Sequence, residues 1–420
     1  MRRSHRFPSA LVPLTLVALL AACSSDGGDA SPSTSGAGAE TTAATVAETT
    51  APSTTAEPTT TTVDPAAAAQ AYTEAGEHKV GVTTLQLAKG PKVEIWYPAA
   101  DDTVVGTETY DVRDFTPDAV KALLTGDVPS TFSYDATRDA DVADGTFPVV
   151  LFSHGFSGFR LQSTFLTAHL ASHGMIVVSP DHPSRALPDV LGGTSTGDRA
   201  DSVDDLLQSL DLITAAGTDP TSIFDGHVDT ERVAAVGHSA GGGTILGAAA
   251  DERVDGYVSM ASGVLLGRAA DGSTTTTVDP ASLPAKPSFF LAGSVDNIVP
   301  VATVTEPSFR TVPSPSLLWV IDGVGHNGFD DFCTFGNGQG IIGVAEANGL
   351  GAFLDAQPQL KSLGQDGCIA PALPVDTTFP IIRHAVTAWL LAHFGVDAEP
   401  VGLDESVADQ YSTPVRIEAR

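Results

Sequence analysis

The sequence is poor in basic residues. Its 420 residues include 21 Lys and Arg against 51 Asp and Glu, which gives a formal net charge of −30. Binding to nucleic acid requires a basic face for the phosphates, so this balance excludes a nucleic-acid partner. The same charge argues against electrostatic docking on anionic lipid.

The N-terminus lacks a hydrophobic run long enough to cross a membrane. The apolar segment at residues 10–22 follows a short basic start, and it falls below the ~20 residues that span a bilayer as a helix. This combination predicts a signal peptide over residues 1–22. The segment ends in Leu-Ala-Ala before Cys23, which resembles a bacterial lipobox. We therefore expect export and a lipid anchor at Cys23 on the outer face of the membrane, with ordinary cleavage and secretion as the alternative.

Core-forming residues are scarce over residues 23–70. Ser, Thr, Gly, Ala, Pro and acidic residues dominate this segment, and such a composition cannot bury enough apolar surface to fold. We predict a disordered linker that carries the lipid anchor. Cysteine is also scarce, because only Cys333 and Cys368 follow Cys23. In an exported protein these two are expected to form a disulfide, and free buried thiols are the alternative.

Residues 71–400 carry the pattern of one α/β domain. Apolar strand patterns at 147–153 and 175–178 flank a helical pattern at 161–170, and an amphipathic helix at 198–216 leads to another strand. Strands that alternate with helices predict a mainly parallel sheet with helices on both faces. Further predicted elements are a hairpin at 80–97, an insertion or lid at 101–145, strands at 233–236, 254–260 and 287–293, a loop at 263–284, a last strand at 317–321, a closing helix at 381–394 and a C-terminal tail at 401–420.

The segment Gly237-His238-Ser239-Ala240-Gly241 stands between the strand at 233–236 and a helix of small residues. G-x-S-x-G in this setting is typical of the nucleophile elbow of the α/β-hydrolase fold, a strained turn that holds a serine hydroxyl at the end of a parallel sheet. Glycine is required at Gly237 and Gly241, because a Cβ there would meet neighbouring backbone. We predict Ser239 as the nucleophile and expect His238 to point away from the substrate.

A serine hydroxyl becomes nucleophilic only with a base beside it and an acid that orients the base. In the α/β-hydrolase order, the acid and then the histidine follow later strands. Asp296 follows the strand at 287–293 and is the predicted acid, whereas His326 follows the strand at 317–321 and is the predicted base. Asp322 also ends a strand and is the rival acid. Because ligands bind at the carboxyl ends of parallel strands, these loops should converge.

Acyl transfer also needs two donors for the developing oxyanion. We expect the backbone N–H groups of Ala240 and Phe156 to supply them, and the Phe156 ring to line the pocket. His154 is expected to brace the loop that carries Phe156. Asp330 and Asp331 are expected to be solvated surface carboxylates. The chemistry requires no cofactor and no metal.

Three segments resemble known esterase families. Residues 152–160, FSHGFSGFR, and residues 325–332, GHNGFDDF, are similar to platelet-activating-factor acetylhydrolases. Residues 294–300, SVDNIVP, resemble the acid segment of dienelactone hydrolases and cutinase-like polyester hydrolases. The first family places its acid soon after the strand that follows the nucleophile, where residues 258–262 hold no carboxylate. The polyester branch has methionine where Ala240 stands and a tryptophan near residues 258–262, which is absent here.

The resemblance implies a serine carboxylesterase that acts on a small-molecule or lipid ester through an acyl-Ser239 intermediate. We expect the protein to be a monomer. The resemblance to platelet-activating-factor acetylhydrolases implies short-acyl lipid esters as substrates. The resemblance to dienelactone hydrolases and cutinase-like polyester hydrolases implies polyesters or lactones. A peptidase or thioesterase would use the same apparatus. A catalytically silent surface-binding protein on the same scaffold is the alternative from another class.

Overall fold

The computed structural model describes residues 64–124, 129–263, 267–268, 274–275 and 279–420. The predicted signal peptide, Cys23 and the linker as far as residue 63 lie outside these ranges, as does part of the loop predicted at 263–284. No helix of the described residues is both long and apolar enough to span a bilayer.

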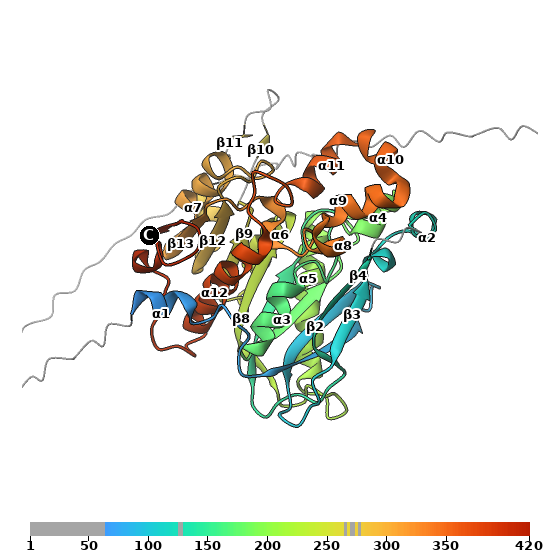
Figure 1. Ribbon diagram of the computed structural model, residues 1–420. Coiled ribbons are helices and arrows are strands. Elements are labelled where there is room, and N and C mark those ends of the chain that lie inside the picture. The colour runs from blue at the N-terminus through green and yellow to red at the C-terminus, as the bar shows by residue number, and fades with distance from the viewer. Residues whose placement is uncertain (1–63, 125–128, 264–266, 269–273, 276–278) are drawn as a thin grey trace, which may run out of the picture. The chain divides into compact units, whose positions relative to one another are not determined.

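A ten-stranded sheet runs through the described chain (Figure 1). Its strands are β1 (Lys79–Gln86), β2 (Lys92–Ala99), β5 (Thr137–Arg138), β6 (Phe147–Ser153), β7 (Ile176–Pro180), β8 (Val228–His238), β9 (Gly256–Met260), β12 (Ser288–Gly293), β13 (Ser316–Ile321) and β14 (Val415–Ala419). Their order is β14-β13-β12-β9-β8-β6-β7-β2-β1-β5. All neighbours from β13 to β7 pair in parallel, whereas β14, β2 and β1 join through antiparallel pairs. The predicted mainly parallel sheet is therefore confirmed.

Helices cover both faces of this sheet. The longer ones are α3 (Thr164–Ser172), α5 (Arg199–Ala216), α6 (Ala240–Ala248) and α12 (Val375–His393). Successive side chains of a strand point to opposite faces, and β6 shows the result. Val150 and Phe152 join a core cluster with α3 and α12, whereas Val149 and Leu151 join another with α5 and α6. These two buried layers fix the strand ends from which the site is built.

The domain begins earlier than predicted. Helix α1 (Pro65–Gln70) lies within the predicted linker at 23–70, yet Ala68 and Ala69 are buried. Its helical start is favoured by Asp64, whose side chain accepts the N–H of Ala66 and caps the helix. The prediction was wrong here because these alanines pack with the rest of the domain.

The predicted C-terminal tail at 401–420 is also part of the domain. Strand β14 pairs antiparallel with β13 at the edge of the sheet, so the strand at 317–321 is not the last one. Val415 and Ile417 are buried in the core while Arg416 between them is exposed. This alternation is the ordinary signature of a strand with one buried face, and it extends over only five residues.

The insertion predicted at 101–145 forms a small separate sheet and two short helices, and it also contributes β5 to the edge of the ten-stranded sheet. Strands β3 (Thr107–Asp111) and β4 (Thr131–Asp135) pair antiparallel, and η1 (Val112–Phe115) and α2 (Asp118–Lys121) lie between them in the chain. The other short elements are α4 (Leu187–Gly192), β10 (Gly267–Arg268), β11 (Thr274–Thr275), η2 (Pro280–Ser282), η3 (Val301–Thr305), α7 (Glu306–Thr311), η4 (His326–Phe329) and η6 (Glu405–Val407).

A group of short helices over residues 335–365 forms what we call the cap (Figure 1). Its elements are α8 (Phe335–Gly338), α9 (Gly340–Ala345), η5 (Glu346–Leu350), α10 (Gly351–Asp355) and α11 (Pro358–Gln365). Cys333 and Cys368 flank the cap and form the predicted disulfide. This bond holds the two ends of the cap together beside the loop that carries His326.

Candidate active site

Ser239 lies in a strained turn between β8 and α6. Its backbone has φ 55° and ψ −121°, a left-handed conformation that costs free energy in a residue other than glycine. A Cβ on Gly237 would lie 2.5 Å from the carbonyl oxygen of Gly241, and one on Gly241 would lie 1.9 Å from that of Ser153. Neighbouring backbone atoms therefore leave no room for a side chain at Gly237 or Gly241, as predicted. The N–H of Ser239 donates to Met260, on the neighbouring strand β9, at 2.9 Å.

The side chains of Ser239, His326 and Asp296 form one hydrogen-bonded chain. His326 Nε2 lies 2.8 Å from Ser239 Oγ, and His326 Nδ1 lies 2.9 Å from Asp296 Oδ2. The other Asp296 oxygen accepts the N–H groups of Ile298 and Val299 at 2.8 and 2.7 Å. A carboxylate held in this way keeps the proton of the imidazole on Nδ1 and leaves Nε2 free to accept the serine proton.

The rival acid does not reach the histidine. Asp322 Oδ1 accepts the hydroxyl of Ser294 at 2.7 Å, and the Asp322 N–H donates to Pro414. Since β13 turns at Gly323 (φ 74°), the chain changes direction between Asp322 and His326. The structure therefore brings together Ser239, Asp296 and His326 and leaves Asp322 outside.

The loop after β6 lies against the serine. The Cβ position of Gly155 is 3.2 Å from Ser239 Cβ, and the Gly155 N–H donates to Gln162 Oε1 at 2.8 Å. Within the described chain, the N–H groups of Phe156 and Ala240 donate no hydrogen bond. Both therefore remain available to an oxygen bound beside Ser239. The Phe156 ring is 48% exposed and lines the pocket described below.

The buried His238 supports the site through hydrogen bonds to Gln162 and to the backbone of His326. Gln162 Nε2 donates to His238 Nδ1 at 2.9 Å and to Asp330 Oδ2 at 2.8 Å, and His238 Nε2 donates to the carbonyl oxygen of His326 at 3.0 Å. Burial lowers the pKa of His238 well below its ordinary value, so the ring is neutral and its Nδ1 can accept. One glutamine thus connects the Phe156 loop, the elbow and the histidine loop.

Asp330 and Asp331 are fully buried, so the prediction of solvated carboxylates is wrong. Asp330 accepts the Gln162 amide and the N–H of Phe332, and Asp331 accepts the N–H of Phe165. Desolvation raises the pKa of Asp330 well above its ordinary value and that of Asp331 to about 8. The aromatic residues on either side of this pair are the sequence signal of an inward-facing segment.

A second serine, histidine and aspartate are linked in the same way beneath the Phe156 loop. Ser153 Oγ lies 2.9 Å from His182 Nε2, and His182 Nδ1 lies 3.0 Å from Asp205 Oδ2. Ser153 and His182 have no exposed surface, and Asp205 is 3% exposed. Burial lowers the pKa of His182 well below its ordinary value. Ser153 stands in the segment at 152–160 that resembles the acetylhydrolases, but nothing in the sequence links it to His182 and Asp205, so this cluster was not predicted.

Arg185 joins this second cluster to the Phe156 loop. Its guanidinium donates to Ser153 Oγ at 2.8 Å and to the carbonyl oxygen of His154 at 3.1 Å, and its own carbonyl accepts the N–H of Ser157 at 2.9 Å. His154 adds the predicted bracing contact, since its Nδ1 donates to Gly155 at 2.8 Å. Desolvation lowers the pKa of Arg185 to about 9. These contacts hold the loop on both sides of Phe156.

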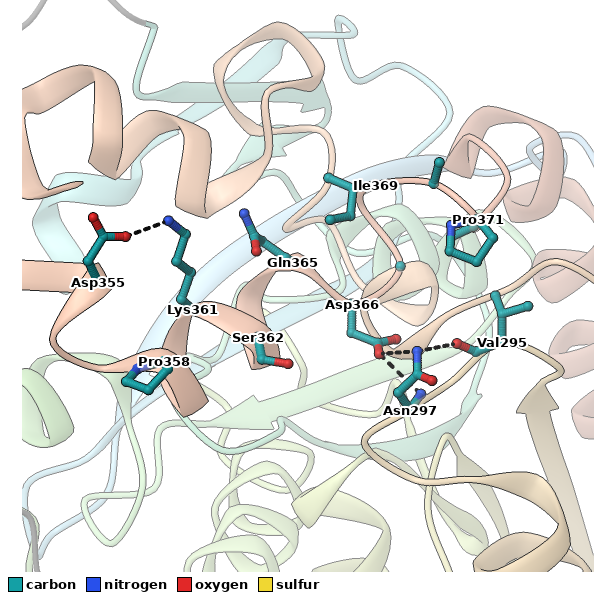
Figure 2. A pocket seen from close by; sticks show the side chains of 13 residues that line it. Val295, Asn297, Asp355, Pro358, Lys361, Ser362, Gln365, Asp366, Ile369 and Pro371 are labelled. Carbon is teal, nitrogen blue, oxygen red and sulfur yellow. Dashed lines mark hydrogen bonds and ion pairs between the residues drawn. The ribbon is translucent and has the colours of Figure 1, made fainter. Parts of the chain in front are cut away.

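Asp366 connects the acid loop to the histidine loop. One oxygen of its carboxylate accepts the N–H of His326 at 2.7 Å. The other accepts the N–H and side-chain amide of Asn297 at 3.1 and 3.0 Å (Figure 2). Asn297 is the residue after Asp296. Sequence analysis missed Asp366, and the only available signal was its place two residues before Cys368. It lines a surface hollow of about 400 Å³ behind the site.

Ser239 and His326 open into an apolar pocket of about 290 Å³. Its walls come from the Phe156 loop, from η1, α2 and the residues after them, from α4 and from the cap. The insertion predicted at 101–145 therefore does form part of a cover over the site. Among the described residues, no group of three or more His, Cys, Asp or Glu is placed to hold a metal ion.

Two family models match parts of the chain. The model described as PET hydrolase-like matches residues 134–341, and the one described as platelet-activating factor acetylhydrolase, isoform II, matches residues 69–187. Each covers less than half of the sequence, and together they span the Phe156 loop, Ser239, Asp296 and His326.

Three relatives are similar in sequence. A bis(hydroxyethyl) terephthalate hydrolase of Streptomyces coelicolor is 30% identical over 41% of this chain and 47% of the relative. A cutinase of Thermobifida alba is 27% identical over 41% of this chain and 50% of the relative. A platelet-activating factor acetylhydrolase of Bos taurus is 29% identical over 26% of this chain and 27% of the relative. The matches thus span half or less of these relatives.

A solved structure shares the fold over most of the chain. It is a ferulic acid esterase from Streptomyces cinnamoneus, with a TM-score of 0.58 and 21% sequence identity. The superposition covers 81% of this chain and 97% of that one. At this identity the likeness shows a common architecture.

Proposed function

Since the chain belongs to the α/β-hydrolase superfamily and resembles esterases within it, we propose that it hydrolyses carboxylic esters through an acyl-Ser239 intermediate. The observation that carries this proposal is the hydrogen-bonded chain from Asp296 through His326 to Ser239 at the wall of an apolar pocket. The three side chains stand at the ends of separate strands, as general-base activation of a serine requires.

The proposed reaction begins when His326 Nε2 takes the proton of Ser239 as its oxygen attacks the ester carbonyl carbon. Asp296 keeps the other imidazole proton in place and stabilises the imidazolium. The N–H groups of Phe156 and Ala240 donate to the developing oxyanion. His326 then protonates the leaving alcohol, and the acyl group remains on Ser239. Water attacks this acyl group, gives its proton to His326, and releases the carboxylic acid while Ser239 regains its proton.

For the substrate we propose a small-molecule or lipid ester, with short-acyl lipid esters first, as the name of the bovine relative suggests. The segment around the Phe156 loop carries this resemblance. The second candidate is a polyester or a related aromatic ester, as the names of the other two relatives suggest. It is favoured by the position of Asp296, and disfavoured by Ala240 in place of methionine.

For the location we propose export through the signal peptide at 1–22, followed by lipid attachment at Cys23 and action as a monomer outside the cell membrane. The support is the basic start, the short apolar segment and the cysteine that ends it. Replacing Cys23 by Ser should move the protein from the membrane fraction to the medium. Protein that stays with the membrane after this change would contradict the anchor.

Turnover of p-nitrophenyl acetate by the wild-type chain and by Ser239→Ala tests the proposed activity. The variant should lose on the order of 10⁶-fold in kcat, as other serine nucleophiles do, while its thermal midpoint stays close to that of the wild type. A variant that keeps turnover would contradict the assignment of Ser239. A wild-type chain that hydrolyses no ester, thioester or peptide would favour the silent binding protein.

A further inference from the structure

The pocket beside Ser239 is walled by branched aliphatic side chains. The cap contributes Ile342, Leu354 and Leu363, and the segment from η1 onward contributes Val112, Val120 and Leu124. Among the residues that line the pocket, none is Asp, Glu, Lys or Arg. A charged group placed there would lose its hydration without gaining an oppositely charged partner.

The mouth of the pocket is also apolar. Leu123, Phe156 and Phe353 are 57%, 48% and 41% exposed, and all three line this pocket. They come from the insertion, the loop after β6 and the cap, which are three separate segments. Exposed large apolar side chains that gather at one opening are typical of a binding site for an apolar ligand.

The size and chemistry of the pocket select among ester substrates. At about 290 Å³ it lies near the lower end of the range for small-molecule sites, so it has room for more than an acetyl group. Its aromatic lining is limited to phenylalanine, at Phe156, Phe332 and Phe353. The rest of its apolar lining is aliphatic, which suits a linear chain better than a flat ring.

We propose that this pocket binds a linear aliphatic chain of the ester substrate, several carbons long, directly beside the reacting carbonyl. The proposal rests on the proposed function, since it identifies the group that Ser239 and His326 act next to. The chain can belong to the acyl group or to the alcohol, as in a lipid ester. In either position each methylene that enters the pocket leaves water and strengthens binding in the transition state.

Two substrate series test the proposal with the wild-type protein below the aggregation limit of each ester. One lengthens the acyl chain of p-nitrophenyl esters from acetate to octanoate, and the other lengthens the alcohol of alkyl acetates. Burial of one methylene contributes about 0.8 kcal/mol, so kcat/KM should rise about fourfold per methylene in at least one series. The series in which kcat/KM rises identifies whether the acyl chain or the alcohol enters the pocket.

Variants of the pocket provide the structural control. Ala345→Trp, on the wall, and Leu123→Ser, at the mouth, should each lower the ratio of octanoate to acetate kcat/KM at least fivefold. Leu123 is exposed, so its replacement keeps the test valid if Ala345→Trp does not fold. Ile369→Ser is the matched control, because Ile369 is 54% exposed and does not line this pocket. Its ratio should equal that of the wild type.

The outcomes separate this proposal from the proposed function. If acetate esters are hydrolysed but kcat/KM does not rise with chain length in either series, the aliphatic site is wrong and the esterase assignment stands. Faster turnover of p-nitrophenyl benzoate than of every alkanoate would also overturn the aliphatic site, in favour of an aromatic one. If no ester is hydrolysed and Ser239 does not react with a fluorophosphonate, the proposed function itself fails.

Discussion

The described residues contain two hydrogen-bonded sets of serine, histidine and aspartate, and one of the two faces the apolar pocket. In the set of Ser239, His326 and Asp296, the serine to histidine and histidine to aspartate distances are 2.8 and 2.9 Å. In the buried set of Ser153, His182 and Asp205, the corresponding distances are 2.9 and 3.0 Å. Hydrogen-bond geometry alone therefore does not distinguish a reactive set from a structural one.

The difference lies in access and in the other partners of each serine. Ser239 stands in a strained turn at the wall of the pocket, whereas Ser153 is the last residue of β6 and has no exposed surface. Arg185 donates a hydrogen bond to Ser153 Oγ, which occupies a lone pair that a nucleophile would use. A positive charge at this position also disfavours an imidazolium on His182. The buried set thus serves to hold the Phe156 loop.

The largest contrast is expected between the two aspartates. Asp296→Asn should lower kcat by about 10⁴-fold, as the wrong histidine tautomer does in the serine-protease triad, with little change in thermal midpoint. Asp205→Asn should lower kcat less than tenfold and reduce the free energy of unfolding by about 1–3 kcal/mol, because a buried charge-assisted network loses a partner. Ester turnover and urea unfolding of both variants measure the contrast. Equal losses of turnover would show that the two sets are not functionally distinct.

A smaller effect is expected from the carboxylate that connects two loops of the reactive set. Asp366→Ala should lower kcat on the order of 10- to 100-fold through misplacement of His326 relative to Asp296, with little change in KM. Asp366→Asn should recover part of the loss, because its amide oxygen can still accept the N–H of His326. Asp355→Ala is the control, since Asp355 lines the same hollow but pairs with Lys361.

Titration of active sites with a fluorophosphonate distinguishes positioning from a general loss of structure. Misplacement of His326 should lower kcat while the concentration of sites labelled at completion equals that of the wild type. A loss of stability alone would lower the concentration of labelled sites in proportion to the lost turnover. If Asp366→Ala and Asp355→Ala give the same kcat, the connecting role of Asp366 is wrong.

The smallest expected effect is the contribution of the buried His182 to the pH dependence of the free energy of unfolding. Burial lowers the pKa of His182, so the folded protein leaves it neutral while the unfolded chain protonates it below its ordinary pKa of 6.5. The unfolded state then binds more protons, and the free energy of unfolding falls as the pH falls, by on the order of 1 kcal/mol between pH 7.5 and 5.5 for this group. His182→Gln lacks this contribution. The pKa of Asp331, raised to about 8, makes the free energy of unfolding rise as the pH falls. This contribution is the same in the wild type and in His182→Gln.

Urea unfolding of the wild type and His182→Gln at the two pH values checks the prediction. The variant should be less stable than the wild type at pH 7.5, and the difference between them should narrow at pH 5.5. A difference that stays constant or widens on acidification would show that His182 is not held neutral in the folded protein.

The sequence predicts the reactive set because its residues stand where strands end. Parallel strands deliver their following loops to one edge of the sheet, so Asp296 after β12 and His326 after β13 had to lie near Ser239 after β8. The sequence favours Asp296 over Asp322 through the resemblance of residues 294–300 to the acid segment of dienelactone hydrolases, although both aspartates follow strands. The turn at Gly323 decides between them.

The parts that escaped prediction depend on distant contacts. Strand β14 is recognisable only through its pairing with β13, and α1 only through the packing of two alanines. In the sequence, Asp205 on the long helix α5 cannot be told from a solvated acid. In the structure, a hydrogen bond with His182 and an ion pair with Lys89 stabilise it in a buried position. Four of the five cap elements are six residues long or shorter, which is too short for a helical period to be recognised in the sequence. The role of the cap emerges from the pocket that it lines.

Reaction of the folded wild-type protein with a fluorophosphonate, followed by peptide mapping, tests the distinction between the two sets most directly. We expect one modified residue, Ser239, and an unmodified Ser153, with labelling lost in Ser239→Ala and retained in Ser153→Ala. Modification of Ser153 in the folded protein, or a folded protein whose Ser239 does not react, would contradict this expectation.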